Sequence, residues 1–297
     1  MFDHDLMRRR LLRAETRGAT GFLAAHAGGD MADRLAMVTR TFETIATVWT
    51  PVDGIRALAL DTDRSADGKA KARRVVHVVP GSAPGLAGSI TGTAEALPLA
   101  PASFDLIASS LGLTFANDLP GALIQIARAL KPDGLFMATM LGGDTLKELR
   151  QAFTLAEADI TGGASPRVAP FIAVREAGGL LQRAGLALPV ADTESITVRY
   201  AHPLALFQDL RAMGATNMLL QRSRTPMTRR LLGRLIEAYG DIATDPDGRV
   251  RATFEIVHLS GWAPHESQQK PLRPGSARAK LAEALGTSEE SAGEKAG

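Results

Sequence analysis

Residues 104–110 read FDLIASS, residues 117–120 read NDLP and residues 130–141 read LKPDGLFMATML, and these segments decide the fold. The first segment, and the third from Leu135 to Leu141, are apolar runs of strand length. Between them, apolar residues recur at helical spacing after a segment that can cap a helix, and the Lys-Pro-Asp-Gly turn ends that helix. A strand, a helix and a second apolar strand predict a parallel sheet that is covered on both faces. We therefore expect an α/β fold.

The N-terminal part of the chain is predicted to be helical, because apolar residues between Leu35 and Val48 follow helical spacing. We expect the first parallel strand at Ile55–Leu60 and the second at Arg74–Val79. Only the twelve residues Thr62–Arg73 separate the two predicted strands. A parallel crossover with its helix needs at least ~10–12 residues. The first helix of the sheet is therefore expected to be stunted or replaced by a loop.

The C-terminal part is predicted to add two strands and a helical insertion. Alternating apolar residues indicate strands at Leu186–Tyr200 and Arg251–Leu259. Two stretches of helical spacing lie between them, Leu204–Met213 and Met227–Tyr239. The expected domains are a helical cap at 1–50, a sheet domain at 51–268 with an insertion at about 203–247, and a Pro/Gly/Ser-rich tail at 269–297 that is disordered at its end.

Composition excludes several classes of protein. The hydrophobic fraction of 45% and the charged fraction of 22% are ordinary for a globular protein, and a net charge of +2 gives no argument for nucleic acid. The chain has no cysteine, which removes disulfides, thiolate catalysis and cysteine-ligated metals. No apolar run approaches the ~18 residues of a membrane helix. Asp3 and Asp5 precede the first arginines without an apolar signal core, so we expect a cytoplasmic protein.

The three opening segments together resemble the second half of a class I S-adenosylmethionine (SAM) methyltransferase. The resemblance of Gly142–Leu146 and Glu148–Arg150 points to a narrower family. They are similar to the methyltransferase-like complex I assembly factors of the arginine-hydroxylase type, which are related to the malonyl-carrier-protein methyltransferase of biotin synthesis. The resemblance covers almost the whole chain and implies a class I methyltransferase-like, Rossmann-like sheet that is mostly parallel. The ends of the chain resemble the same family at Phe2-Asp3, Leu6, Arg8–Arg10, Gly261-Trp262, His265–Gln268 and Pro274–Ala277.

The resemblance implies that SAM binds at the carboxyl ends of the strands, above all at a glycine-rich loop after the first strand. With the first strand at Ile55–Leu60, this loop has no glycine before Gly68. The second strand ends without an acidic residue for the ribose, and His77 is either a substitute or a half-buried strand residue. Thr93 stands where the family tends to place an aspartate for the adenine. The candidate cofactor-binding residues are Asp61, Asp63, Ala94, Glu95, Ser110 and Leu111.

Losing several of these contacts would weaken SAM binding by roughly 100-fold to 10,000-fold, at ~0.5–1.5 kcal/mol for each hydrogen bond. We therefore expect SAM to be the cofactor by family, at a degenerate site.

Candidates for catalysis lie after the fifth strand and near the C-terminus. Asp144 and Thr145 follow two glycines beside the expected cleft, and the alternative is a glycine turn in which Asp144 caps a helix. His265 and Glu266 precede a serine, but adjacent residues cannot form a hydrolase triad, whose geometry is spatial. No metal site is predicted, because spacing alone does not bring His265 and Glu266 to Asp144.

Three function classes follow. The resemblance implies a protein that acts on a protein client, with a complex I subunit as the expected partner. The second class is an active SAM-dependent methyltransferase on a carboxylate, of the biotin-pathway type, and the third is a non-catalytic scaffold or chaperone. Basic clusters at Arg8–Arg13 and at Arg222, Arg224, Arg229 and Arg230 are compatible with an acidic partner or a membrane surface, but a solvated face is the commoner outcome for such clusters.

Overall fold

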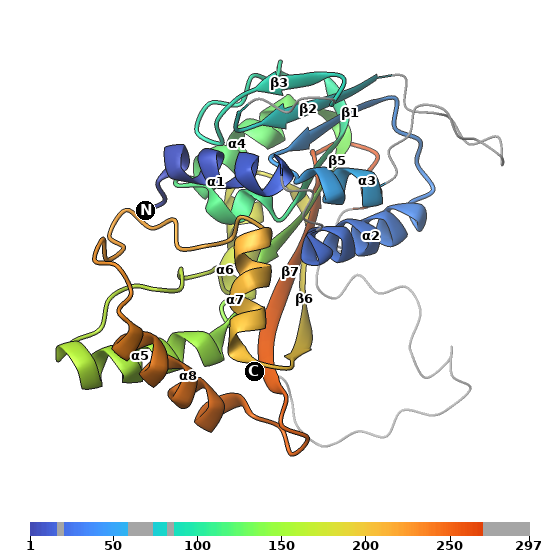
Figure 1. Cartoon of the computed structure of the whole chain (residues 1–297). Helices are drawn as coiled ribbons and strands as arrows, with labels where there is room; N and C mark the ends of the chain where they lie inside the picture. Colours follow the sequence, from blue (N-terminus) through green and yellow to red (C-terminus); the bar gives the residue numbers. More distant parts are fainter. Residues whose placement is uncertain (17–20, 59–73, 82–85, 270–297) are drawn as a thin grey trace, which may run out of the picture. The chain divides into compact units, whose positions relative to one another are not determined.

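The computed structural model describes residues 1–16, 21–58, 74–81 and 86–269. Within the unit Met1–Pro264, a seven-stranded sheet has the order β3-β2-β1-β4-β5-β7-β6 (Figure 1). Strands β1 to β5 are parallel to one another, and β7 runs antiparallel to both β5 and β6. The bounds are β1 Thr44–Val48, β2 Arg74–Val79, β3 Ser89–Thr91, β4 Phe104–Ser110, β5 Leu130–Leu141, β6 Ala187–Tyr200 and β7 Val250–Trp262. The strand order reverses between β1 and β4, so a ligand crevice is expected at their carboxyl ends.

The described helices divide among three hydrophobic clusters around this sheet. Helices α4 and α6 pack with the N-terminal helix α1 on one cluster, and α2 and α3 pack on a second. The third cluster joins α5, α7 and α8 to the long strands β6 and β7. The bounds are α1 His4–Thr16, α2 Phe22–Ala36, α3 Val52–Leu58, α4 Leu119–Ala129, α5 Lys147–Thr161, α6 Val174–Arg183, α7 Pro203–Ala212 and α8 Arg229–Ala243, with a 3-10 turn η1 at Gly112–Phe115.

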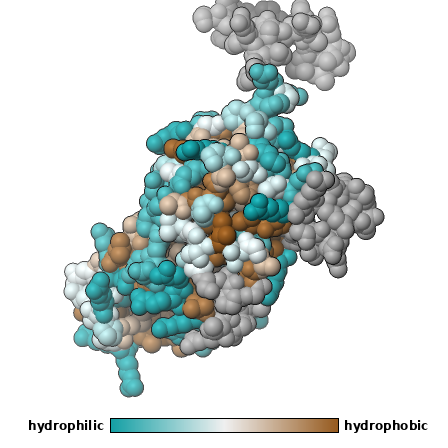
Figure 2. All heavy atoms as spheres, turned by 90° about the horizontal axis from the view of Figure 1, so that it is seen from above, coloured by the Kyte–Doolittle hydropathy of each residue, from teal (hydrophilic) through white to brown (hydrophobic). Residues whose placement is uncertain are grey.

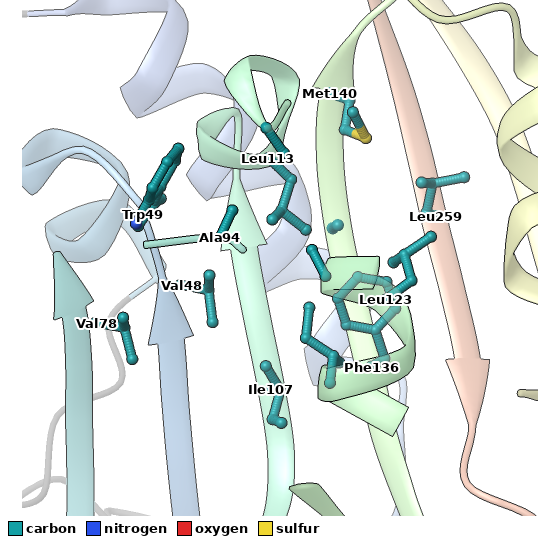
Figure 3. Close-up of a cluster of buried hydrophobic side chains, with 14 of the residues drawn as sticks. Val48, Trp49, Val78, Ala94, Ile107, Leu113, Leu123, Phe136, Met140 and Leu259 are labelled. Carbon is teal, nitrogen blue, oxygen red and sulfur yellow. The ribbon is translucent and has the colours of Figure 1, made fainter. Parts of the chain in front are cut away.

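The predicted strand–helix–strand unit at the centre of the sheet is confirmed as β4, α4 and β5. Asp118 is the N-cap of α4, where its carboxylate accepts from the Gly121 N–H at 2.9 Å. The apolar stripe of α4 is fully buried at Leu123 and packs over Phe136 of β5 (Figure 3). Helix α4 ends at Ala129 and β5 begins at Leu130, so the predicted Lys-Pro-Asp-Gly turn lies within β5, where Lys131 pairs with Asp105 at 3.0 Å. The cap and the apolar stripe of α4 agree with each other, which explains why this helix could be predicted from the sequence.

The predicted first strand is wrong. Ile55–Leu58 belong to helix α3, which begins at Val52 and ends at Leu58, and residues 59 and 60 lie outside the described residues. The first strand is β1, whose Ile45 pairs with Val75 on one side and with Leu106 on the other. A short apolar run fits a buried strand and a buried helix equally well, and only tertiary packing decides between them. The packing here is the close contact of α3 with α2, where a Cβ on Gly28 would lie 2.6 Å from the Gly54 carbonyl oxygen.

This correction shifts two further predictions. The sheet begins at Thr44, inside the cap predicted for residues 1–50, which therefore contains α1 and α2 but not only helices. The crossover from β1 to β2 covers residues 49–73 and is therefore longer than the predicted twelve residues, and its described part contains the seven-residue helix α3. Residues 59–73, with the candidates Asp61 and Asp63, lie outside the described residues.

The C-terminal predictions agree better with the structure. The predicted inserted helices are present as α7 and α8, between β6 and β7. Helix α6 precedes β6 and begins at Val174. His265–Gly297 form a second unit, of which residues 265–269 are described.

The surface of the described part is mixed. No described helix is both long enough and apolar enough to cross a membrane. On the face drawn in Figure 2, hydrophobic residues gather near the middle and hydrophilic residues surround them.

Candidate functional site: a cavity at the carboxyl ends of the strands

A cavity of about 1080 Å³ lies where the strand order reverses. Its floor comes from the residues that follow β1 and β4 and from the ends of β2 and β5. These include Trp49, Val79, Leu111 and Leu141. Its walls come from α1, α2, α5 and α7 and from the segment 213–218. The position agrees with the crevice that the predicted sheet requires.

The loop after β1 contains Trp49, whereas the resemblance implies a glycine-rich loop at this place. The φ angle of Trp49 is 52°, a left-handed conformation that favours glycine. Its side chain is buried, the indole N–H donates to the Gly92 carbonyl oxygen at 2.9 Å, and its ring meets His4 edge to face at 5.2 Å. The indole therefore fills the space between the loops that follow β1 and β3.

The loops after β1 and β4 are locked together. A Cβ on Gly112 would lie 2.0 Å from the Trp49 carbonyl oxygen, so only glycine fits at this position. The Ser110 N–H donates to the Thr50 hydroxyl at 3.0 Å, and the Ser109 hydroxyl donates to the Val48 carbonyl oxygen at 2.7 Å. The polar groups of this floor are thus already satisfied by one another.

The described residues after β1 and β2 differ from the pattern of SAM contacts that the resemblance implies. From Thr44 to Asp53 there is no glycine, and the nearest carboxylate, Asp53, accepts from the Gly21 N–H at 2.7 Å and lies 3.7 Å from Arg56. Residues 74–81, which contain β2 and its end, have no acidic residue for a ribose. The loop that was predicted to lack a glycine before Gly68 lies outside the described residues, and the first glycine after β1 is Gly54 of α3.

Of the other predicted cofactor contacts, Leu111 lines the cavity, and Ala94, Glu95 and Ser110 are not among its described lining residues. Ala94 is fully buried, and Glu95 accepts from the Asn117 N–H at 3.1 Å with His4 at 3.8 Å. Ser110 is fully buried, whereas Leu111 lines the cavity. His77 is not at the site.

His77 instead lies within the sheet, where its Nδ1 is 2.8 Å from the Thr47 hydroxyl of β1. Burial lowers the pKa of His77 from its ordinary value of 6.5. Of the two interpretations of His77, the structure agrees with a strand residue within the sheet and not with a ribose contact.

The family-like segment Gly142–Arg150 holds the cavity wall together. The Thr145 side chain is fully buried, where its hydroxyl donates to the Glu255 carbonyl oxygen and accepts from the Glu255 N–H, both at 3.1 Å. Glu148 accepts from the N–H and the hydroxyl of Thr253. Arg150 donates to the carbonyl oxygens of residues 143, 145 and 169 at 3.3–3.5 Å.

Asp144 is not the helix cap that the alternative interpretation required. Leu146 occupies the N-cap position of α5, with no side-chain cap. The Asp144 carboxylate pairs with Lys147 at 3.0 Å, and its N–H donates to Glu255 at 2.9 Å. The site therefore brings Thr145 to the wall of the cavity and leaves Asp144 exposed.

The candidates His265 and Glu266 belong to the second unit. There the His265 Nδ1 lies 2.7 Å from the Ser267 hydroxyl, and its N–H donates to Gln268 at 3.3 Å. Among the residues with described positions, no group of three potential ligands can hold a metal ion.

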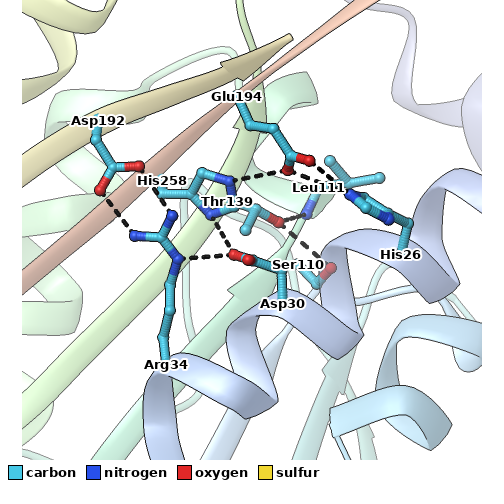
Figure 4. A network of polar contacts seen from close by, with 9 residues as sticks. All are labelled: His26, Asp30, Arg34, Ser110, Leu111, Thr139, Asp192, Glu194 and His258. Carbon is cyan, nitrogen blue, oxygen red and sulfur yellow. Dashed lines mark hydrogen bonds and ion pairs between the residues drawn. The ribbon is translucent and has the colours of Figure 1, made fainter. Parts of the chain in front are cut away.

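A polar network between α2 and the strands β6 and β7 was not predicted (Figure 4). His258 of β7 is buried, with its Nδ1 3.1 Å from Asp30 and its Nε2 3.6 Å from Glu194. Neither nitrogen makes a well-oriented hydrogen bond within the described residues. Arg34 binds Asp192 with two hydrogen bonds, at 2.7 and 3.0 Å. The available signal was the four-residue spacing of His26, Asp30 and Arg34 on one helix face.

The electrostatics of His258 follow from this setting. Burial lowers the pKa of His258 first, and the positive charge of Arg34 lowers it further. The carboxylates of Asp30, Asp192 and Glu194 oppose the shift without reversing it. We therefore take His258 as neutral near pH 7, which agrees with a ring buried beside an arginine.

Comparison with known proteins identifies the domain. Residues 45–138 match the methyltransferase domain family. The chain is 42% identical over 195 residues to the mitochondrial arginine-hydroxylase NDUFAF5 of Homo sapiens, which is 66% of this chain and 56% of that protein. It is 41% identical over 181 residues to the malonyl-[acyl-carrier protein] O-methyltransferase of Laribacter hongkongensis, 61% of this chain and 58% of that protein. The matches thus span a little over half the length of these two relatives.

A solved structure agrees on the fold. The YcgJ protein of Bacillus subtilis superposes with a TM-score of 0.53 at 14% sequence identity, over 81% of this chain and 99% of that one. At this identity the likeness concerns the fold alone. Together with the strand order, it makes the predicted class I methyltransferase-like sheet a confirmed feature of the chain.

Proposed function

We propose that this chain, which carries a methyltransferase domain and is a homologue of the arginine-hydroxylases, acts on a protein client during the assembly of respiratory complex I. The observation that carries the proposal is Trp49, a buried indole at φ 52° in the loop where the fold family places its cofactor. We expect a protein that keeps the fold but has an indole in this loop to depend less on SAM than on binding its client.

The homology supports the class of client. The relatives at about 42% identity are named arginine-hydroxylases, whereas the malonyl-[acyl-carrier protein] O-methyltransferases match over a similar share of the chain at 41%. The second group transfers a methyl group, which requires SAM. The unsuitable residues of the loop after β1 therefore favour the first group.

The surface that we assign to the client is the exposed basic segment before and at the start of α8. Arg224, Arg229 and Arg230 are exposed, whereas Arg222 is held by Asp3 at 3.1 Å and by the Leu219 carbonyl oxygen. Exposed arginines can bind carboxylates in a bidentate manner, which suits an acidic surface on the client.

The test is recovery of the client from cells that express the tagged full chain. Replacing Arg224, Arg229 and Arg230 by Glu should abolish recovery of complex I subunits, whereas replacing the exposed Arg175 and Arg183 of α6 by Glu should leave it intact. Mass spectrometry of recovered subunits should show an arginine that gains the mass of one oxygen atom. Equal recovery by both variants would contradict the client surface, and an unchanged client mass would favour the scaffold alternative.

The alternative function is a SAM-dependent methyltransferase that acts on a carboxylate. The methyltransferase domain match over residues 45–138 favours it. SAM affinity separates the two functions, because methyl transfer needs saturable SAM binding and the client function as proposed here does not.

A further inference from the structure

The cavity is at the upper end of the size range for ligand pockets. Pockets for drug-sized ligands hold about 300–1,000 Å³, and this cavity holds about 1080 Å³. Much of its wall belongs to helices rather than to the ends of the strands. We call the part of this cavity that is lined by α5, α7, Met218 and Phe254 its second chamber, and the part at Trp49 and Leu111 its floor.

The second chamber is apolar. Leu149 and Phe153 of α5, Phe207 of α7, Met218 and Phe254 line it, and Phe153 and Phe207 are only partly buried. Such aromatic and aliphatic walls favour an apolar ligand, because each methylene group removed from water is worth ~0.8 kcal/mol.

The charge of Arg167, which lines the cavity beside Phe153, is already paired with a carboxylate. Arg167 binds the Glu157 carboxylate, with its Nε 2.7 Å from Oε1, and its guanidinium lies 5.5 Å from the centre of the Phe153 ring. This pair therefore contributes no unpaired charge to the cavity. The wall beside it offers apolar contact.

The remaining charged groups of the lining are mostly positive. Arg8, Arg9, Arg56 and Arg211 are all exposed, and they come from three different helices. Asp53 is the acidic residue among the described lining residues, and its carboxylate already accepts from Gly21. Arg8 pairs with Asp5, but within the described residues the Arg211 guanidinium has no carboxylate partner.

We propose that the cavity binds an amphipathic anion, namely a long-chain carboxylate whose apolar chain occupies the second chamber and whose carboxylate is bound by Arg211 at the exposed rim. Charge complementarity selects this ligand: a carboxylate pairs with a guanidinium in a bidentate manner, whereas a cationic group would meet four arginines and a single engaged aspartate. The inference concerns the same cavity as the proposed function but does not depend on it.

The experiment is calorimetric titration of the full chain with dodecanoate, dodecan-1-ol and dodecylammonium at low ionic strength. We expect saturable binding of dodecanoate, weaker binding of the alcohol and none of the ammonium ion. Octanoate should bind at least about tenfold more weakly than dodecanoate if the chain is buried.

Variants locate the carboxylate. Arg211→Gln should weaken dodecanoate binding about tenfold, Arg211→Lys should restore most of it, and Arg183→Gln on α6 is the matched control that should change nothing. Circular dichroism checks that each variant is folded. Equal binding of the anion and the cation, an equal effect of Arg211→Gln and Arg183→Gln, or no heat with dodecanoate would each overturn the proposal. None of these results depends on SAM or on a client, so the proposed function is tested separately.

Discussion

The two sides of helix α2 meet opposite kinds of surroundings. Leu23 and Ala24, near its start, line an apolar cavity of about 1080 Å³. His26, Asp30 and Arg34 face a network of charged groups on β6 and β7, where the adjacent space is only about 30 Å³. One side therefore faces an open cavity with apolar walls and arginines in its lining, and the other side faces a closed and densely charged network.

The difference separates the side of α2 that lines a binding cavity from the side that holds the helix on the sheet. Charges that are fixed by partners hold α2 in place, so its cavity side can remain apolar without collapsing onto the sheet. A buried polar network is specific only if its members are satisfied, and His258 is the member that is least well satisfied. We therefore expect substitutions on the cavity side to change the fold of the loops, and those on the network side to change how stability depends on pH.

The largest effect should come from Gly112→Ala on the cavity side. The new Cβ would lie 2.0 Å from the Trp49 carbonyl oxygen, so the loops after β1 and β4 must separate. Overpacking of this kind lowers the free energy of unfolding by about 1–3 kcal/mol or more. Gly143→Ala is the control, because its Cβ would meet nothing within 4 Å. Urea unfolding that shows equal stability for the two variants would contradict the tight contact.

The network side should give an effect that depends on pH. Because burial lowers the pKa of His258, the unfolded chain binds more protons than the folded chain once the pH falls below about 6.5. Stability should then fall on acidification from that pH down through the lowered pKa, by at most about 1.4 kcal/mol per pH unit for one histidine. His77, whose pKa is also lowered by burial, adds to the same loss.

Urea unfolding at several pH values between 5.5 and 7.5 measures this slope. His258→Gln should flatten it, and His265→Gln in the second unit should leave it as in the wild type. A wild-type stability that rises on acidification over this range would show that the carboxylates around His258 prevail over burial and Arg34.

The smallest effect should come from Arg34→Gln. The side chains of Arg34 and Asp192 are 37% and 43% exposed, so the loss should be at most about 1 kcal/mol and should shrink at high salt. The variant should also raise the pKa of His258, because it removes a positive charge that lowers it. Titration of the His258 ring by NMR checks this, and an unchanged pKa would exclude coupling between the two residues.

The part of the fold that sequence could predict is the part with agreeing local signals. For α4, the cap at Asp118 and the apolar stripe lie within one short stretch. For β1, the strand Thr44–Val48 lies at helical spacing with earlier apolar residues, and the longer run at Ile55–Leu60 competed with it. That one misassignment moved the expected cofactor loop away from Trp49.

The candidate site was predictable in position but not in composition. The carboxyl ends of the strands follow from the fold class alone. By contrast, the partners of Thr145 and of His26 lie 110 and 168 residues away, and no spacing rule reaches them. The same holds for Asp53, which binds Gly21 across the start of α2.

The most direct test of the central claim is titration of the purified full chain with SAM by calorimetry. If Trp49 and the residues around it have replaced the contacts that the cofactor needs, the titration should show no saturable heat at concentrations up to about 1 mM, which corresponds to binding weaker than about 4.1 kcal/mol. Saturable binding at micromolar SAM, with one site per chain, would contradict the account and make the chain a SAM-dependent enzyme.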